Sequence, residues 1–416
     1  MSRADCFLVV AHSARLLAQS AARARHPVCA LDLFNDTDTG RFALAAEAVR
    51  ARIGAGAGFD REDLLRRAER LCPPSRCLGL VYGAGFEDDT ETLALLARGR
   101  ELLGNRPQLV ARLKDPVGFF GLLDRLGIPH PQTALTLPGP GRGWLYKRRG
   151  ASGGAHVVDA AAAGAEPAGA GYFQRRASGR NLSLLFLADG RRARVIGISR
   201  QLTRRAASRR YQYAGAAGPV QLPPAVSRTL HAALQALVAD TGLVGCNSVD
   251  FLLDGTRPAV LEINPRPSAT MDLYDANWPA GLFDAHLNAC RGRLPRAGAG
   301  GAVRAHAIVY APAALRIAPD TAFAAWCSDI PRPGSTVPVD APVCTVHAGG
   351  ADLAGALRQL RRRRQRTEWE LTTRLDSEET ENGCKNNTPQ RESQRGPAGR
   401  SAAGATQRPA PGRASP

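Results

Sequence analysis

Residues 261–272 read LEINPRPSATMD, and this stretch places two polar side chains on one face of an expected β-strand. Successive side chains of a strand point to opposite faces, so Glu262 and Asn264 share a face while the leucine and isoleucine share the other. An apolar face is usual for a strand that covers a core. A carboxylate and a carboxamide that point the same way, with Arg266 shortly after them, indicate a ligand site.

The run before it, 247–253, is expected to pair with 259–265 in a hairpin around the turn sequence DGTRP. A register centred on that turn places Asp250 opposite Glu262. Opposed carboxylates repel each other unless a cation lies between them, and Asn264 offers a third oxygen. Such a set suits Mg²⁺, which takes one or two carboxylates together with phosphate oxygens. The alternative is that all three side chains face solvent.

A glycine-rich turn separates two expected strands at 143–158, GWLYKRRGASGGAHVV. Lys147 precedes the turn, and the glycines would let the backbone approach an anion. Only three of the 55 basic residues are lysines, so Lys114 and Lys147 are more informative than lysines usually are. A guanidinium beside an acidic site, as at Arg266, is best explained by a shared phosphate. The turn is neither a P-loop nor a dinucleotide fingerprint.

The first hundred residues alternate apolar runs with helical patterns, which predicts an open parallel sheet. The expected strands lie at 6–11, 28–34 and 77–89, and the expected helices lie from Ser13, near 41–53, near 61–71 and from Thr90. Ligands of such sheets bind at the carboxyl ends of the strands. The candidate substrate contacts at those ends are His12, Arg15, Asp36 and Glu87. The alternative is that these loops are only polar turns.

The pattern changes after Asn105. A helix is expected from about Asp115, because proline at 116 suits a first helical turn. The runs 172–190 and 193–202 are expected to form a hairpin-like pair, and 224–242 has helical spacing. The predicted organisation is a Rossmann-like domain at 1–104, a central domain at 105–300 with a lid at about 143–178, a β-rich region at 301–354 and a disordered, Arg-rich tail at 355–416.

The composition is that of a soluble globular protein, with 44% hydrophobic and 22% charged residues. Of the net charge of +18, +6 belongs to residues 358–416, which hold 13 basic and 7 acidic residues. The remaining +12 is spread along the rest of the chain, which suits anionic small ligands such as nucleotides. The one dense basic run, RRRRQR at 361–366, lacks interleaved aromatic residues, so nucleic-acid binding is not expected.

Nine cysteines without a secretory signal indicate reduced thiols and a cytoplasmic protein. Cys72 and Cys77 have no second pair at metal spacing, so zinc is not expected. No apolar run reaches transmembrane length, so no membrane partner is expected.

Four segments in order resemble the ATP-grasp superfamily of carboxylate–amine ligases: KDPVGFFGLLDRLGIPHPQT, YKRRGASGG, FQRRASGRNLS and SVDFLL…LEINPRP. The most specific part is the spacing from Asp250 to Glu262, Asn264 and Arg266. The resemblance implies an α/β fold in which a parallel-sheet domain precedes the ATP-grasp module at 105–300. AHSARLLAQSA, LDLFNDTDT and LEINPRPSATMDLYD look closest to ATP-grasp proteins of tetrahydromethanopterin and methanofuran one-carbon metabolism, which are similar to tyramine–glutamate ligases.

The resemblance also assigns roles. Lys114 and Lys147 match lysines that contact ATP phosphates, and Arg266 matches the arginine near the transferred phosphoryl group, so Arg266 and Lys147 are the expected catalytic residues. The expected metal ligands are Asp250, Glu262 and Asn264, for Mg²⁺ or Mn²⁺. The further expected ATP contacts are Gly150, Ser152, Gly153, Gly154, Gln174, Arg175 and Ala177. Gln174 and two arginines stand where an acidic residue is common in the family, and Ser248 stands where peptide-forming members often have an arginine.

The reaction that this predicts is attack of a substrate carboxylate on the γ-phosphate of Mg-ATP, followed by displacement of phosphate from the acyl-phosphate by an amine. The expected partners are ATP, a small carboxylic acid and an amine, and a homodimer is one possible assembly. The alternatives are a carboxylase-type or other phosphoryl-transfer enzyme, and a nucleotide-binding protein without turnover. The joint presence of the metal ligands and Arg266 argues against the last.

Overall fold

The computed structural model describes residues 5–52, 58–163, 169–204, 210–296, 298 and 300–385, with side chains up to Thr372. The chain divides into two compact units, Met1–Thr372 and Thr373–Pro416. All features below belong to the first unit unless stated. In the described residues no helix combines the length and the apolar character needed to cross a membrane.

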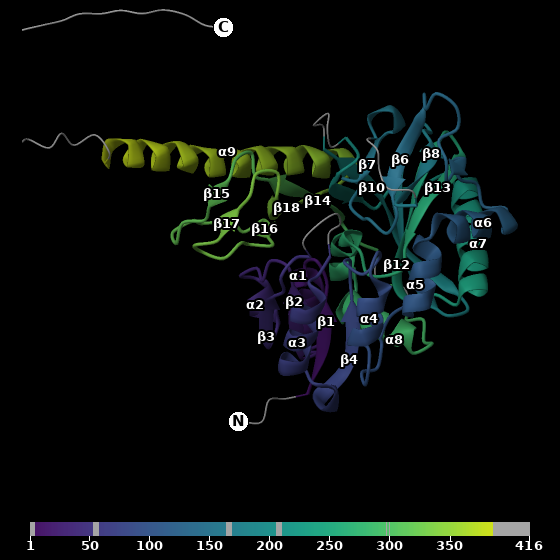
Figure 1. Ribbon diagram of the computed structural model, residues 1–416, viewed down its shortest axis with the longest axis horizontal. Coiled ribbons are helices and arrows are strands. Elements are labelled where there is room, and N and C mark those ends of the chain that lie inside the picture. Colours follow the sequence, from purple (N-terminus) through teal and green to yellow (C-terminus); the bar gives the residue numbers. More distant parts are fainter. Residues whose placement is uncertain are drawn as a thin grey trace, which may run out of the picture. The chain divides into compact units, whose positions relative to one another are not determined.

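The N-terminal region contains a four-stranded parallel sheet in the order β3-β2-β1-β4, which confirms the predicted open parallel sheet (Figure 1). Alternate residues of β1 face two helical layers. Phe7 and Val9 pack with helices α1 and α8, while Leu8 and Val10 pack with α3 and α4. Because both faces are covered, the strand is a continuous apolar run. The bounds are β1 Cys6–Val10, α1 Arg15–Arg23, β2 Val28–Asp32, β3 Ala45–Ala48, α3 Arg61–Leu71, β4 Cys77–Tyr82, α4 Thr90–Leu96 and α8 Gly281–Cys290.

The prediction of a helix near 41–53 is wrong. The structure has a single helical turn, α2 (Thr39–Phe42), and then the edge strand β3, which pairs in parallel with β2. The alanine-rich composition favours a helix, but an open edge beside β2 offers its backbone hydrogen bonds to this segment. Residue 53, the last of the predicted helix, lies outside the described part of the chain.

The central layer is an eight-stranded sheet in the order β13-β12-β9-β10-β11-β14-β18-β16, in which every recorded pairing is antiparallel. Helices α6 and α7 cover one face through a cluster that includes Phe119, Leu234 and Phe251. Helix α6 begins at Pro116, where Asp115 Oδ2 accepts the backbone N–H of Gly118 at 2.8 Å, so the predicted helix start is confirmed. The bounds are α6 Pro116–Arg125, β9 Arg180–Asp189, β10 Ala193–Thr203, β11 Tyr213–Gly218, α7 Pro224–Thr241, β12 Val244–Asp254, β13 Arg257–Asn264, β14 Val303–Tyr310, β16 Cys327–Ser328 and β18 Pro342–Gly350.

A smaller antiparallel sheet, in the order β5-β8-β6-β7, carries the glycine-rich turn between β6 and β7. The run 172–190, predicted as one strand, is split between β8 of this sheet and β9 of the central sheet. Gly179 lies at the break with φ +132°, and a Cβ there would come within 2.9 Å of the Leu253 backbone. The close approach of two backbones therefore breaks the strand. The bounds are β5 Thr133–Ala134, β6 Trp144–Arg148, β7 Val157–Asp159 and β8 Gly171–Arg175.

The C-terminal strands β14, β18 and β16 extend the central sheet, while β15 (Leu315–Arg316) and β17 (Thr336–Val337) pair by themselves. Helix α9 spans Leu353–Lys385, so the predicted disorder from 355 is wrong for this part of the tail, and 386–416 lies outside the described residues. Ala356, Leu360 and Leu371 are buried. A spaced apolar stripe inside an arginine-rich sequence therefore holds the helix in place.

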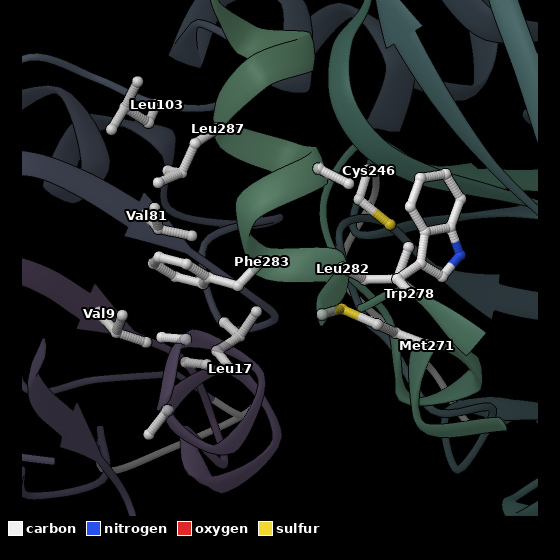
Figure 2. Close-up of a cluster of buried hydrophobic side chains, with 14 of the residues drawn as sticks. Val9, Leu17, Val81, Leu103, Cys246, Met271, Trp278, Leu282, Phe283 and Leu287 are labelled. Atoms are coloured by element: carbon white, nitrogen blue, oxygen red, sulfur yellow. The ribbon is translucent and has the colours of Figure 1, made fainter. Parts of the chain in front are cut away.

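One buried cluster joins the N-terminal sheet to the central sheet (Figure 2). Val9 and Val81 of the parallel strands meet Phe283 of α8, and Cys246 and Met271 belong to the same cluster on the other side of α8. Phe283 is fully buried. The loops at the carboxyl ends of the parallel strands are thereby held beside the β12–β13 hairpin.

Candidate active site

Strands β12 and β13 bring the predicted metal ligands onto one face. The register pairs Asp250 with Glu262 and Ser248 with Asn264, which confirms the predicted opposition of the two carboxylates. Asn264 Nδ2 donates to Asp250 Oδ2 at 3.4 Å. Lys114 Nζ, at the end of α5 (Pro107–Lys114), donates to Asn264 Oδ1 at 3.1 Å and lies 3.4 Å from Glu262 Oε2. Two carboxylates, an amide and an ammonium thus form one polar cluster.

The two carboxylates of this cluster lie opposite each other, and a cation between them would relieve their repulsion. Burial raises the pKa of Asp250 to about 6, and the negative charge of Glu262 adds to the shift. Burial acts in the same direction on Glu262, but Lys114 and then Lys147 lower its pKa. Among the described residues no group of three His, Cys, Asp or Glu side chains is placed to hold a metal. Two carboxylates and one amide oxygen fit Mg²⁺ where a substrate phosphate completes the ligands.

Arg266 is held in place by Glu87. Arg266 Nε donates to Glu87 Oε1 at 2.8 Å, and Arg266 Nη2 donates to Asn264 Oδ1 at 3.3 Å. Glu87 also accepts the backbone N–H groups of Gly85 and Phe86 at 2.7 and 3.0 Å. Burial alone would raise the pKa of Glu87, but Arg266 and Lys114 lower it to about 2, so the carboxylate is ionised. The structure therefore places Glu87, a predicted substrate contact, against Arg266.

Lys147 projects from β6 toward the same carboxylates. Burial lowers its pKa, while Glu262 and Asp250 act in the opposite direction. Lys147, Lys114 and Glu262 line a small cavity of about 70 Å³ together with His156. Burial lowers the pKa of His156 to about 4, so this imidazole is neutral near pH 7. Sequence reasoning gave His156 no role, and its position two residues after Gly154, the second glycine of the pair, was the available signal.

The glycine-rich turn lies against the segment at Tyr211–Tyr213. Gly150, Gly153 and Gly154 have φ of +64°, +72° and +73°, a backbone conformation that favours glycine. A Cβ on Gly154 would overlap the carbonyl oxygen of Tyr211, whereas one on Gly153 would have no atom within 4 Å. The backbone N–H of Tyr213 donates to the Gly153 carbonyl at 2.8 Å. Ser152, Gly153 and Gly154 line the main cavity, and Gly150 lines the small one.

A main cavity of about 800 Å³ extends from the hairpin to the N-terminal loops. This volume is in the usual range for small-molecule sites. The predicted hinge residues Gln174, Arg175 and Ala177 line it, with Leu252 and Leu261 as apolar neighbours. Gln174 is buried and its Nε2 has no hydrogen-bond partner among the described residues, so a donor is available at this wall. Lys147, Asp250, Glu262, Asn264 and Arg266 line the same cavity.

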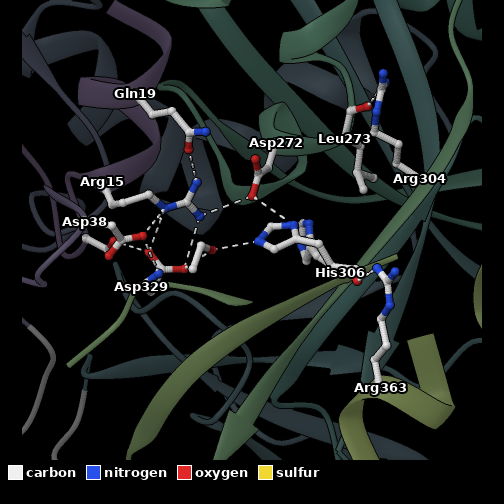
Figure 3. A network of polar contacts seen from close by, with 12 residues as sticks. Arg15, Gln19, Asp38, Asp272, Leu273, Arg304, His306, Asp329 and Arg363 are labelled. Carbon is white, nitrogen blue, oxygen red and sulfur yellow. Dashed lines mark hydrogen bonds and ion pairs between the residues drawn. The ribbon is translucent and has the colours of Figure 1, made fainter. Parts of the chain in front are cut away.

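His12, Arg15 and Asp36, which the sequence predicts as substrate contacts, line the end of the cavity at the N-terminal loops. Arg15 is only 4% exposed and is fully engaged (Figure 3). Its Nε and Nη2 donate to the two Asp329 carboxylate oxygens at 3.0 and 3.1 Å, and Nη2 also donates to Asp272 at 3.2 Å. An anionic substrate would have to displace these carboxylates from Arg15. Arg15 therefore links the residues of the pocket wall to one another.

Sequence reasoning missed three polar residues of this wall, Asp272, His306 and Asp329. Asp272 belongs to the single-turn helix η4 (Ala269–Leu273), directly after the LEINPRPS stretch. Burial lowers the pKa of His306 to about 4, and Tyr213 Oη lies 2.7 Å from its Nε2. Asp329 comes from a loop after β16, and no local pattern marked it.

Comparison with known proteins assigns the fold. Residues 115–270 match the family model described as an ATP-grasp domain. The chain therefore contains an ATP-grasp domain behind a parallel-sheet N-terminal region, which confirms the predicted fold class.

Several solved structures share this fold. Biotin carboxylase from Campylobacter jejuni is 14% identical with a TM-score of 0.66, over 85% of this chain and 89% of that one. N5-carboxyaminoimidazole ribonucleotide synthetase from Thermotoga maritima is 15% identical with a TM-score of 0.59, over 87% and 98%. Pyruvate carboxylase from Rhizobium etli is 15% identical with a TM-score of 0.65, and the match spans 86% of this chain but 37% of that one. A search of curated protein sequences found no match.

Proposed function

We propose that this protein is an ATP-dependent carboxylate–amine ligase that forms an amide through an acyl-phosphate. The observation that carries the proposal is the convergence of Asp250, Glu262, Asn264, Arg266 and Lys147 on one cavity beneath the glycine-rich turn. Hard oxygen ligands, two basic side chains and a turn of accessible backbone are what a magnesium-bound triphosphate requires. ATP-grasp domain membership of residues 115–270 agrees with it.

Each residue then has a defined task. Magnesium, held by Asp250, Glu262 and Asn264, would supply charge neutralisation at the β- and γ-phosphates. Lys114 and Lys147 neutralise further phosphate charge, and Ser152 to Gly154 close over the triphosphate. Arg266, oriented by Glu87, faces the transferred phosphoryl group and the acyl-phosphate. The chain contributes positioning and electrostatic stabilisation, with no side-chain nucleophile.

A carboxylase-type reaction is the second candidate. It is favoured by the carboxylases among the solved structures of this fold. Bicarbonate would then be the acid that is phosphorylated.

The narrower proposal follows the resemblance to tyramine–glutamate ligases. The acid would be glutamate, the amine tyramine-like, and the pathway methanofuran or tetrahydromethanopterin biosynthesis in the cytoplasm. Mn²⁺ would replace Mg²⁺ with these ligands, and a homodimer is the proposed assembly.

A coupled ADP-release assay across acids and amines, including glutamate, tyramine-like amines and bicarbonate, tests the proposal. We expect release that requires both a carboxylic acid and an amine. Glu262→Gln should reduce it by at least about 100-fold, because a charge at the transferring phosphate is lost. Glu62→Gln, at an exposed position, is the matched control and should retain activity. Bicarbonate-dependent turnover without an amine would favour the carboxylase, and undiminished turnover in Glu262→Gln would contradict both.

A further inference from the structure

Pro265, the residue directly before Arg266, is buried, so its carbonyl oxygen needs a partner within the protein. Strand β13 ends at Asn264, and the proline has no backbone N–H with which to continue the ladder. Asn105 Nδ2 donates to the Pro265 carbonyl at 2.9 Å. Tyr82 Oη lies 3.3 Å from the same oxygen, but the closer acceptor of its single hydrogen is the Asn105 carbonyl at 2.7 Å. Asn105 therefore supplies the main hydrogen bond to the backbone at Arg266.

The carboxamide of Asn105 is held on both of its sides. Asn105 is 2% exposed, and its Oδ1 accepts the backbone N–H of Val244 at 2.9 Å. Because a backbone N–H requires an acceptor opposite it, this contact fixes which way the carboxamide faces. Its Nδ2 then donates to Asn247 Oδ1 at 2.7 Å as well as to Pro265. Val244 and Asn247 belong to β12, so one side chain joins the start of β12 to the end of β13.

The main chain at Asn105 is held by the parallel sheet. Tyr82, the last residue of β4, is 2% exposed, and its hydroxyl donates to the Asn105 carbonyl. Gly104 lies against the same ring, because a Cβ on it would come within 2.7 Å of a ring carbon of Tyr82. Asn105 thus takes its position from the N-terminal sheet, and its side chain holds Pro265 in turn.

Arg266 is consequently held at two points. Glu87 binds its guanidinium at 2.8 Å, and Asn105 binds the carbonyl that directly precedes it. Glu87 restrains only the end of a long side chain, whose backbone could still move. Because a catalytic group has to lie within about 0.5 Å of its productive position, the second contact is needed as well as the first.

We infer that Asn105 is a positioning residue for phosphoryl transfer, which places Arg266 through the carbonyl of Pro265. The inference rests on the proposed function and deepens it by adding a residue that lines neither of the two cavities. Without the Asn105 contact, Glu87 still pairs with Arg266, but the guanidinium no longer has one fixed position opposite the phosphoryl group.

Hydrogen exchange at the Arg266 side chain tests this in the full chain without substrates. In ¹⁵N-arginine-labelled protein, the Nε–H signal of Arg266 is identified by its absence in Arg266→Lys. Asn105→Ala should speed the exchange of this hydrogen with solvent by about 10-fold or more, because the backbone that carries the side chain is freed. Asn247→Ala removes a buried carboxamide of the same network but leaves the Pro265 contact, so it should change the rate by less than about 3-fold. An unchanged exchange rate in Asn105→Ala would overturn the inference.

A double-mutant cycle on turnover separates positioning from a general loss of stability. With the acid and amine that support ADP release, Asn105→Ala should lower kcat by about 30-fold and change the KM for ATP by less than about 3-fold, because Arg266 acts on the transferred phosphoryl group. In an Arg266→Ala background the same change should lower kcat by less than about 3-fold, since the residue that Asn105 positions is gone. Equal losses of kcat in Asn105→Ala and Asn247→Ala would contradict a positioning role.

If Asn105→Ala does not fold, Asn105→Ser, whose shorter side chain lacks the amide donors, gives the same comparisons. Faster exchange at Arg266 in the variant, without acid-dependent ADP release from any pair of substrates, would remove the ligase proposal and leave the role of Asn105 in placing Arg266. Turnover that requires both substrates, with a loss of kcat in Asn105→Ala that persists in the Arg266→Ala background, would do the reverse.

Discussion

Asp36 is a residue whose burial works against the stability of the fold. Burial raises its pKa to about 8, and the negative charges of Asp329, Asp32 and Asp38 add to the shift. An unfolded chain would ionise this carboxyl near pH 4. The folded state therefore binds its proton more tightly, and the stability from this group is complete below about pH 4 and is lost as the pH rises toward 8.

This sign gives a prediction for Asp36→Asn. The amide stays neutral at every pH, so the variant should unfold at a higher temperature than the natural protein at pH 8, with a difference that shrinks toward pH 5. Thermal unfolding followed by circular dichroism at the two pH values measures this, with Asp320→Asn, the same change at an exposed residue, as the control. An equal change in Tm at both pH values would contradict a raised pKa of Asp36 in the folded protein.

Arg15 is predicted to contribute to stability in the opposite direction. Arg15→Met keeps most of the side-chain volume but leaves Asp272 and Asp329 buried without their shared partner. Removing one member of a buried ion pair typically costs about 3–5 kcal/mol. Urea unfolding should show a loss of that size, and Arg228→Met, at an exposed arginine of α7, should show little change. A loss below about 1 kcal/mol would show that the network is solvated.

These residues show which features of the candidate site could be predicted from the sequence. Alternation along two strands and a short turn were enough to place Asp250 opposite Glu262, since both depend on local geometry. Arg15 was predicted as a substrate contact because it follows a strand end. Its partners, Asp272 and Asp329, lie 257 and 314 positions away, and no local pattern could reveal that they occupy it.

Among the elements, the glycine-rich turn gives the sharpest prediction. Gly154→Ala should displace the turn, because the new Cβ would overlap the Tyr211 carbonyl oxygen. In Gly153→Ala the Cβ meets no atom within 4 Å, and both positions have positive φ, so both variants share the same backbone strain. We expect Gly154→Ala to raise the KM for ATP by about 10-fold or more and Gly153→Ala to raise it much less.

Steady-state kinetics with varied ATP, at saturating acid and amine, separates the two variants. An equal rise in KM for both would mean that backbone strain alone, and not contact with Tyr211, governs the turn. Intact far-UV circular dichroism in both variants is the control for folding.

Elements were predictable where a local pattern dominated. The buried parallel strands, the start of α6 at Pro116 and helix α7 followed from apolar runs, a proline and helical spacing. The prediction of a helix near 41–53 was wrong, because this alanine-rich segment pairs with the open edge of β2 as strand β3. The tail was expected to be disordered from its composition, yet a few buried residues suffice to hold α9.

For the first compact unit as a whole, α9 is part of the structure up to Thr372. Arg363 Nη1 donates to the carbonyl of His347 in β18 at 2.7 Å, and its guanidinium lies 5.0 Å from the Trp326 ring centroid. The arginine run at 361–366 thus supplies at least one side chain to packing. A cation over an aromatic face contributes about 0.5–2 kcal/mol.

Truncation separates the folding role of α9 from the rest of the tail. A chain that ends at Thr372 keeps Ala356, Leu360 and Leu371, so it should unfold within about 2 °C of the full chain. A chain that ends at Gly350 loses them, and each buried leucine contributes about 1.5–3 kcal/mol, so Tm should fall by about 5 °C or more. Differential scanning calorimetry of the three chains measures this. Equal destabilisation of both truncated chains would place the stabilising contacts beyond Thr372, whereas an unchanged Tm in the shorter one would show that α9 does not contribute to the stability of this unit.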